Sequence, residues 1–178
     1  MKRANVLYAL LSFALVATTA LVAKTPKVIF DPKAYYAGNE PKAASAALLA
    51  QGEKLAGEDS WERIGVGRVA YLSGDKQKGE AIFQSVLGSP KVAKSDLYRI
   101  ATMYAANKEW SKAKPLFERA IAMDKEDDSG MLKAGCWFNV NGDRARAEEL
   151  FDGAFAHSPE AAWHYILAAG SYVGVEPF

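Results

Sequence analysis

The stretch that decides the fold runs from residue 94 to residue 127 and reads KSDLYRIATMYAANKEWSKAKPLFERAIAMDKED. The same pattern of small and aromatic residues begins, without a gap, at Ser60, at Asp128 and, for a partial copy, at Ala162. Near the middle of each complete 34-residue frame, two residues separate two stretches of helical periodicity: Gly74-Asp75, Lys108-Glu109 and Gly142-Asp143. Each frame therefore predicts two antiparallel helices joined by a short turn.

Residue size along these frames predicts close packing between the two helices. The eighth place holds Gly67, Ala101, Gly135 and Ala169, and the twenty-fourth place holds Phe83, Phe117 and Phe151. We expect the small residue to let the second helix approach and the phenylalanine to fill the gap against the next pair. Asp75 and Asp143 stand where an N-cap would open the second helix. The predicted fold class is all-α.

On these residues the sequence resembles the tetratricopeptide repeat (TPR) family, whose repeat is also 34 residues long. The agreement is closest at Ile100, Ala101, Tyr104, Ala113, Phe117 and Ala120, and again at Ala134, Gly135, Phe138, Ala147, Phe151, Ala154 and Pro159. The first repeat departs from the family at Arg63 and Gly79, where a bulky apolar residue and an alanine are usual. The resemblance implies a TPR-like domain over residues 60–178, with repeats at about 60–93, 94–127 and 128–161 and a closing helix at 162–174.

The N-terminus is a separate segment in which two basic residues precede an uncharged run from Ala4 to Ala23. About 20 apolar residues can span a bilayer as a helix, whereas a cleaved signal peptide has an apolar core of about 7 to 15 residues. Thr18 and Ala20 also form a small-residue cleavage pattern. Residues 1–24 therefore predict an apolar membrane-anchoring helix or a cleaved signal peptide, and in both cases the remainder is expected outside the cytoplasm, in the periplasm.

Between this leader and the repeats the composition changes twice. Residues 25–41 contain Pro and Gly at intervals that break any helix, so they predict a linker. Residues 42–59 predict a lead-in helix, from Lys42 to Leu55, followed by a turn. Whether residues 42–56 form a degenerate half-repeat stays open at this stage.

Composition argues against several classes of function. The 178 residues include 22 basic and 21 acidic side chains, so nothing favours nucleic acid as a partner. Cys136 is the only cysteine and His157 and His164 are the only histidines, too few for a disulfide framework or a four-ligand zinc site. No spacing of serine, histidine and carboxylate marks a catalytic triad. We therefore expect no catalytic residue, no metal site and no cofactor.

One stripe on the first helix of each repeat is the candidate partner-binding surface. Its members are Trp61, Ile64, Arg68, Tyr71, Tyr98, Thr102, Leu132, Asn139 and Trp163. In the TPR family this stripe faces the concave side, where ligands bind. Trp61 and Trp163 have a second interpretation, as covers for the ends of a short solenoid.

The ligand that this stripe predicts differs from the ligand best known for the family. TPR domains clamp a C-terminal carboxylate with lysines and asparagines, and here only Lys133 and Arg99 could supply such cations. A partly apolar peptide is the better prediction. The chain is thus expected to be an exported or membrane-anchored TPR adaptor for a protein or peptide, and, if uncleaved, to contact the membrane through residues 4–23. The alternative is a constitutive structural subunit of a larger membrane protein complex.

Overall fold

The computed structural model describes residues 31–177, and the chain divides into two units, Met1–Pro32 and Lys33–Phe178. The predicted leader over residues 1–24 and the start of the linker lie outside the described residues. Within the described range, none of the helices combines the length and apolar character that a bilayer crossing requires.

The described residues contain helices and no strands, which confirms the all-α prediction. A short 3-10 helix, η1, spans Pro32–Tyr35. It is followed by α1 (Pro41–Ala56), α2 (Ser60–Leu72), α3 (Lys76–Leu87), α4 (Lys94–Ala106), α5 (Trp110–Met123), α6 (Asp128–Val140), α7 (Arg144–His157) and α8 (Ala162–Tyr172). The helices α2, α4, α6 and α8 begin at the four residues where the sequence frames begin.

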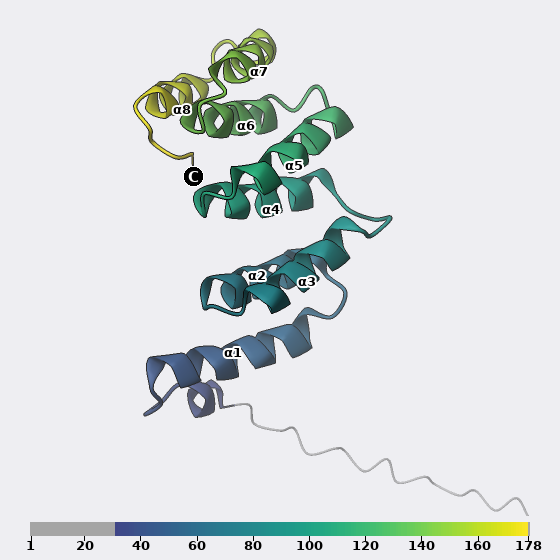
Figure 1. Ribbon diagram of the computed structural model, residues 1–178, viewed down its shortest axis with the longest axis vertical. Helices are drawn as coiled ribbons and strands as arrows, with labels where there is room; N and C mark the ends of the chain where they lie inside the picture. The colour runs from purple at the N-terminus through teal and green to yellow at the C-terminus, as the bar shows by residue number, and fades with distance from the viewer. Residues whose placement is uncertain (1–30, 178) are drawn as a thin grey trace, which may run out of the picture. The chain divides into compact units, whose positions relative to one another are not determined.

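Within the second unit the helices pack in successive pairs (Figure 1). The main contacts of α2 are with α3, those of α4 with α5, and those of α6 with α7. Turns over residues 73–75, 107–109 and 141–143 join the two helices of each pair, so the paired helices run antiparallel. In addition, α2 contacts α4, α4 contacts α6 and α6 contacts α8. The first helices of the pairs therefore lie next to one another and form a common face.

The core is built from the aromatic residues that the frames place between helices. Phe83, Phe117 and Phe138 are buried almost completely, together with Tyr104. Close packing explains why the first repeat has glycine, at Gly79, where the family usually has alanine. A Cβ atom on Gly79 would lie 2.8 Å from the backbone oxygen of Gly67, which is too close for any side chain without a shift of α3.

Both residues predicted as N-caps stand at the N-cap position of their helix. The carboxylate of Asp75 accepts a hydrogen bond from the backbone N–H of Lys78 at 3.1 Å. Asp143 stands at the N-cap of α7, although its side chain accepts no capping hydrogen bond of normal geometry. Its carboxylate pairs instead with Lys114 Nζ at 2.7 Å, because that ammonium group on α5 lies within reach.

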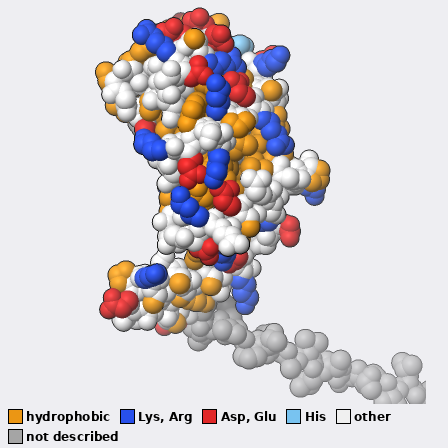
Figure 2. All heavy atoms as spheres, viewed as in Figure 1, with side chains coloured by type: hydrophobic (Ala, Val, Ile, Leu, Met, Phe, Trp, Pro, Cys, Tyr) orange, Lys and Arg blue, Asp and Glu red, His pale blue; other side chains and the backbone are white. Residues whose placement is uncertain are grey.

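Charged side chains of both signs are interspersed over the face seen in Figure 2, with hydrophobic side chains between them. Many of the charges form ion pairs between neighbouring helices, such as Arg146 with Glu118 and Lys112 with Glu80. This distribution agrees with the near balance of charge in the sequence.

Candidate functional site

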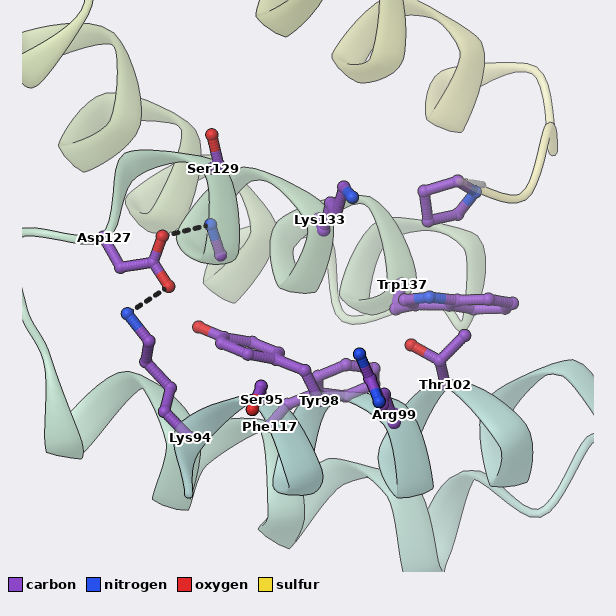
Figure 3. A pocket seen from close by; sticks show the side chains of 12 residues that line it. Lys94, Ser95, Tyr98, Arg99, Thr102, Phe117, Asp127, Ser129, Lys133 and Trp137 are labelled. Atoms are coloured by element: carbon purple, nitrogen blue, oxygen red, sulfur yellow. Dashed lines mark hydrogen bonds and ion pairs between the residues drawn. The ribbon is translucent and has the colours of Figure 1, made fainter. Parts of the chain in front are cut away.

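The common face of α2, α4 and α6 carries two neighbouring hollows. The α4–α6 hollow has a volume of about 430 Å³ and is lined by Lys94, Ser95, Tyr98, Arg99, Thr102, Phe117, Asp127, Ser129, Gly130, Lys133, Trp137 and Pro177 (Figure 3). The α2–α4 hollow has a volume of about 370 Å³ and is lined by Trp61, Ile64, Gly65, Arg68, Leu72, Arg99, Thr102, Met103, Ala106 and Asn107. Arg99 and Thr102 belong to both hollows, so the two form one surface, which we name the first-helix groove.

At one end of the α4–α6 hollow, an ion-paired cluster fixes the start of α6. Lys94 Nζ lies 2.8 Å from Asp127 Oδ2 and 2.7 Å from Asp124 Oδ2. The other oxygen of Asp127 accepts the backbone N–H of Gly130 at 2.9 Å. The hydrogen bond from Lys94 lowers the pKa of Asp124, and the two carboxylates raise the pKa of Lys94. Because these charged groups are already paired with one another, we expect them to fix the shape of the hollow and not to bind a charged ligand.

Tyr98 forms a wall of the same hollow. Its ring lies against Phe117, with the ring centroids 6.2 Å apart, and its hydroxyl oxygen is buried without a hydrogen-bond partner in the described residues. Burial raises the pKa of this hydroxyl. A Cβ atom on Gly130 would lie 2.5 Å from the hydroxyl oxygen, so glycine is needed where the tyrosine reaches α6. Tyr98 is therefore half-buried: it packs between α4 and α6, and part of its side chain is still accessible from the hollow.

Three cations lie along the groove, and none of them forms an ion pair within 4.0 Å in residues 31–177, although Asp96 and Asp59 lie near enough to Arg99 to favour its charge. Arg68 and Lys133 are exposed, and Arg99 stacks its guanidinium group over the ring of Trp61. Burial lowers the pKa of Arg99 from its very high ordinary value, a range in which arginine remains charged. Because α2, α4 and α6 each supply one of them, positive charge follows the whole length of the groove.

The structure brings together five of the nine predicted site residues. Trp61, Ile64 and Arg68 line the α2–α4 hollow, Tyr98 lines the α4–α6 hollow, and Thr102 lines both. Ile64 is buried, so it forms the floor, whereas 63% of Trp61 is exposed.

The other four predicted residues line neither hollow. Tyr71 is buried and donates its hydroxyl hydrogen to Glu109 at the start of α5. Leu132 is in the core, and Asn139 Nδ2 donates to Ser171 Oγ on α8 at 2.9 Å. Trp163 lies on α8 and is half-exposed.

The predicted stripe omits the sixth place of the frame, which faces the groove in every complete repeat, although the sequence indicates Arg99 and Lys133 as possible cations. Gly65, Arg99 and Lys133 occupy it. Their recurrence at intervals of 34 residues was the available signal. The predicted stripe runs through the neighbouring fifth place, at Ile64, Tyr98 and Leu132. Trp137 and Pro177 were also missed. Met103, which is the frame equivalent of Trp137, lines the α2–α4 hollow, so the tenth place was a further available signal, whereas no residue at the place of Pro177 lines either hollow.

Of the remaining reactive groups, Cys136 and His164 are buried and His157 is exposed. Cys136 is fully buried, and loss of solvent raises the pKa of its thiol to about 11. His164 is buried with Nδ1 unpartnered in the described part of the chain. No cluster of three or more potential metal ligands occurs among the described residues.

No family model, curated protein sequence or solved structure matches this chain. The function therefore has to be inferred from the groove itself.

Proposed function

We propose that this chain is a TPR-like solenoid that works as a noncatalytic adaptor, exported or held at a membrane, and binds a peptide segment in the first-helix groove. The observation that carries the proposal is the continuity of the groove across α2, α4 and α6, with a cation from each helix, of which Arg68 and Lys133 are exposed. The TPR-like arrangement is supported by the 34-residue spacing of the helix starts and by the glycine and phenylalanine contacts that recur with it.

The lining of the groove favours a ligand of mixed character. Trp61 supplies exposed apolar surface over a floor that includes the buried Ile64, and an extended peptide or a short helix can cover this surface with its own apolar side chains. Arg68 and Lys133 can pair with carboxylates of the same segment. A flexible segment loses conformational freedom when it docks, so we expect micromolar affinity, about −8 kcal/mol.

The groove is tested by selecting peptides from a random display library on the full-length chain in detergent. The binders should be enriched in Asp or Glu next to apolar residues. The double variant Arg68→Ala with Lys133→Ala should bind them at least tenfold more weakly, about 1.4 kcal/mol, with an unchanged melting temperature because both side chains are exposed.

Lys54 and Lys125 provide the matched control. Both are exposed lysines outside the groove, with no ion pair in the described residues, so replacing both by alanine removes the same charge elsewhere. Equal loss of binding in this control would mean that net charge, and not the groove, captures the peptides. Full binding by the Arg68 and Lys133 variant would contradict the proposal.

A specific feature of α8 favours the second function, a fixed subunit of a membrane complex. Trp163, Tyr165 and Ile166 are each about half-exposed or more, at the end of the helix array where polar side chains are usual. A fixed subunit would co-purify with its assembly in constant ratio, and Trp163→Ser with Ile166→Ser would release it. An adaptor would keep its peptide binding in that variant.

The proposal that the chain is exported rests only on the uncharged run from Ala4 to Ala23. An intact-mass measurement on the chain recovered from membranes distinguishes an anchor from a cleaved signal peptide. Recovery of the full mass in the soluble cytoplasmic fraction would contradict both.

A further inference from the structure

The chain turns back on itself after α8. Gly174 has a φ of +81°, a left-handed conformation that glycine adopts readily, and the backbone N–H of Val175 donates to the Gly170 carbonyl at 3.0 Å. The residues that follow, Val175–Pro177, we name the return segment. Pro177 is buried and lines the α4–α6 hollow. A segment from the C-terminal end of the chain thus contributes to the groove formed by earlier helices.

An ion pair connects the return segment to the turn between α4 and α5. Glu176 Oε1 lies 2.6 Å from Lys108 Nζ. Pro177, one residue further, meets the groove beside Trp137 and Thr102, which line the same hollow. The segment therefore presents an apolar ring to the groove, while its carboxylate pairs with a lysine in the turn next to the groove.

The backbone of Lys108 is a second, independent observation. Its φ is +63°, and among the described residues it is the only one other than glycine with a positive φ. The corresponding turns of the neighbouring pairs carry Gly74 and Gly142 at this place. The turn itself sets this conformation, because the backbone N–H of Glu109 donates to the Tyr104 carbonyl at 2.9 Å, as the equivalent groups do in the other two turns. At Lys108 this turn carries a side chain in place of glycine, and that side chain contacts Glu176.

We propose that the return segment is a tethered occupant of the first-helix groove, which a partner peptide must displace in order to bind. This inference rests on the proposed peptide-binding function. The tether keeps the segment at an effective concentration on the order of millimolar, so a contact too weak to hold a free peptide can still hold the segment in place. The apparent affinity for a partner is then reduced by the fraction of molecules in which the segment is docked.

Docking in solution is tested by zero-length carbodiimide cross-linking of the full-length chain in detergent, followed by mass spectrometry of its peptides. The Lys108–Glu176 pair should couple as efficiently as Lys114–Asp143, a pair of similar separation, 2.7 Å, inside the helix array. Coupling of Lys114 to Asp143 without coupling of Lys108 to Glu176 would overturn the proposal.

Competition is tested with a peptide of residues 173–177, blocked at both ends so that its single charge is the glutamate. Its binding is followed by NMR at up to millimolar concentration, through the Trp137 indole N–H and the Thr102 amide. A chain ending after Gly174 should bind the peptide at least tenfold more tightly than the full chain. Equal affinities, or no binding to the shortened chain, would overturn the proposal.

Glu176→Gln in the full chain is the second variant, because it loosens the segment and leaves all the helices unchanged. It should raise the affinity for the added peptide, whereas Glu160→Gln, an exposed glutamate before α8, should not. If the segment proves undocked while the Arg68 and Lys133 variant still loses its library peptides, the tethered-occupant inference fails and the proposed peptide-binding function stands. If that variant keeps its library peptides, the proposed function itself fails.

Discussion

A methyl group placed on Gly135 would lie 2.8 Å from Cε1 of Phe151. The same relationship occurs two frames earlier, where a methyl group on Gly67 would lie 2.8 Å from Cε1 of Phe83. In both pairs the ring on the second helix rests directly against the backbone of the first. The two helices are therefore as close at these points as a phenylalanine ring allows, which is the packing that the eighth and twenty-fourth places of the frame predict.

Gly135→Leu should destabilise the protein, because the added side chain must displace the Phe151 ring or push α7 away. Overpacking of this kind costs about 1 to 3 kcal/mol, and more where the backbone must move. Urea unfolding followed by circular dichroism measures the difference. A variant as stable as the parent would contradict the packing of α6 against α7.

Gly65 and Gly67 offer a matched comparison on a single helix. A Cβ atom on Gly65 meets no atom within 4 Å, whereas one on Gly67 meets the Phe83 ring. Gly65→Ala should raise the free energy of unfolding by about 0.5 to 1 kcal/mol, because alanine loses less backbone entropy in a helix. Gly67→Ala should lower it. The same sign for both variants would show that helix propensity, and not contact with Phe83, decides the outcome.

The helices were predictable because every frame repeats the same local pattern. The expected helix from Lys42 to Leu55 is α1, Pro41–Ala56, and each first helix begins at the first residue of its frame. Asp143 stands at its predicted N-cap position, but its ion pair with Lys114 on another helix was not predicted. A pattern within one repeat carries no information about such a neighbour.

The site was less predictable than the fold for the same reason. Helical spacing identifies residues on one side of a helix but does not fix the angle at which the next helix covers that side. The stripe predicts Tyr71 in the groove. Its side of α2 faces the paired helix α3, so Tyr71 packs against Phe83 and donates its hydroxyl hydrogen to Glu109. Pro177 is 40 residues from Trp137 in the sequence, and only the turn at Gly174 makes them neighbours.

Tyr98→Phe should stabilise the protein. The hydroxyl oxygen of Tyr98 is buried and no group in the described residues pairs with it, and an unsatisfied buried polar group costs about 1 to 3 kcal/mol. The ring should stay against Phe117 in the variant. Tyr98→Ala is the control and should be destabilising, since it removes the ring as well. A loss of stability in Tyr98→Phe would indicate that an ordered water molecule satisfies the hydroxyl.

Cys136 should be inert in the native protein. Burial raises the pKa of its thiol to about 11, so little thiolate exists at pH 8, and the side chain has no exposed surface. Ellman's reagent should react more than about 100-fold more slowly with the native chain than with the chain in urea. Fast reaction at low denaturant would show that α6 and α8 separate locally without global unfolding.

A chain that begins at Pro26 should be soluble and should unfold in one cooperative transition. The residues from Lys33 onward form a compact unit and contain all of α1 to α8. The shortened chain should keep the helical content of the full chain after correction for its length, measured by circular dichroism. Loss of the transition on removal of residues 1–25 would mean that the apolar leader belongs to the folded core.

Glu109 should make the stability of the protein depend on pH in the acid range. Its carboxylate lies 2.7 Å from Lys112 Nζ and 3.2 Å from Lys76 Nζ, and it also accepts the Tyr71 hydroxyl hydrogen. These hydrogen bonds, that of Lys112 first, lower the pKa of Glu109 from 4.5 to about 2. Because the folded state holds the proton less tightly than the unfolded state, the carboxylate stabilises the fold fully above pH 4.5.

The contribution should disappear as the pH falls from about 4.5 to about 2, where the folded state also takes up the proton. Glu109→Gln should therefore be less stable than the parent at pH 7, and the difference should narrow steadily across that window. Urea midpoints measured at several pH values give the difference directly. Glu126→Gln, at an exposed glutamate between α5 and α6, is the control and should follow the parent at every pH. A stability gap for Glu109→Gln that stays constant from pH 7 to pH 2 would show that the residue acts through the shape of its side chain, and that its charge does not stabilise its contacts with Tyr71, Lys76 and Lys112.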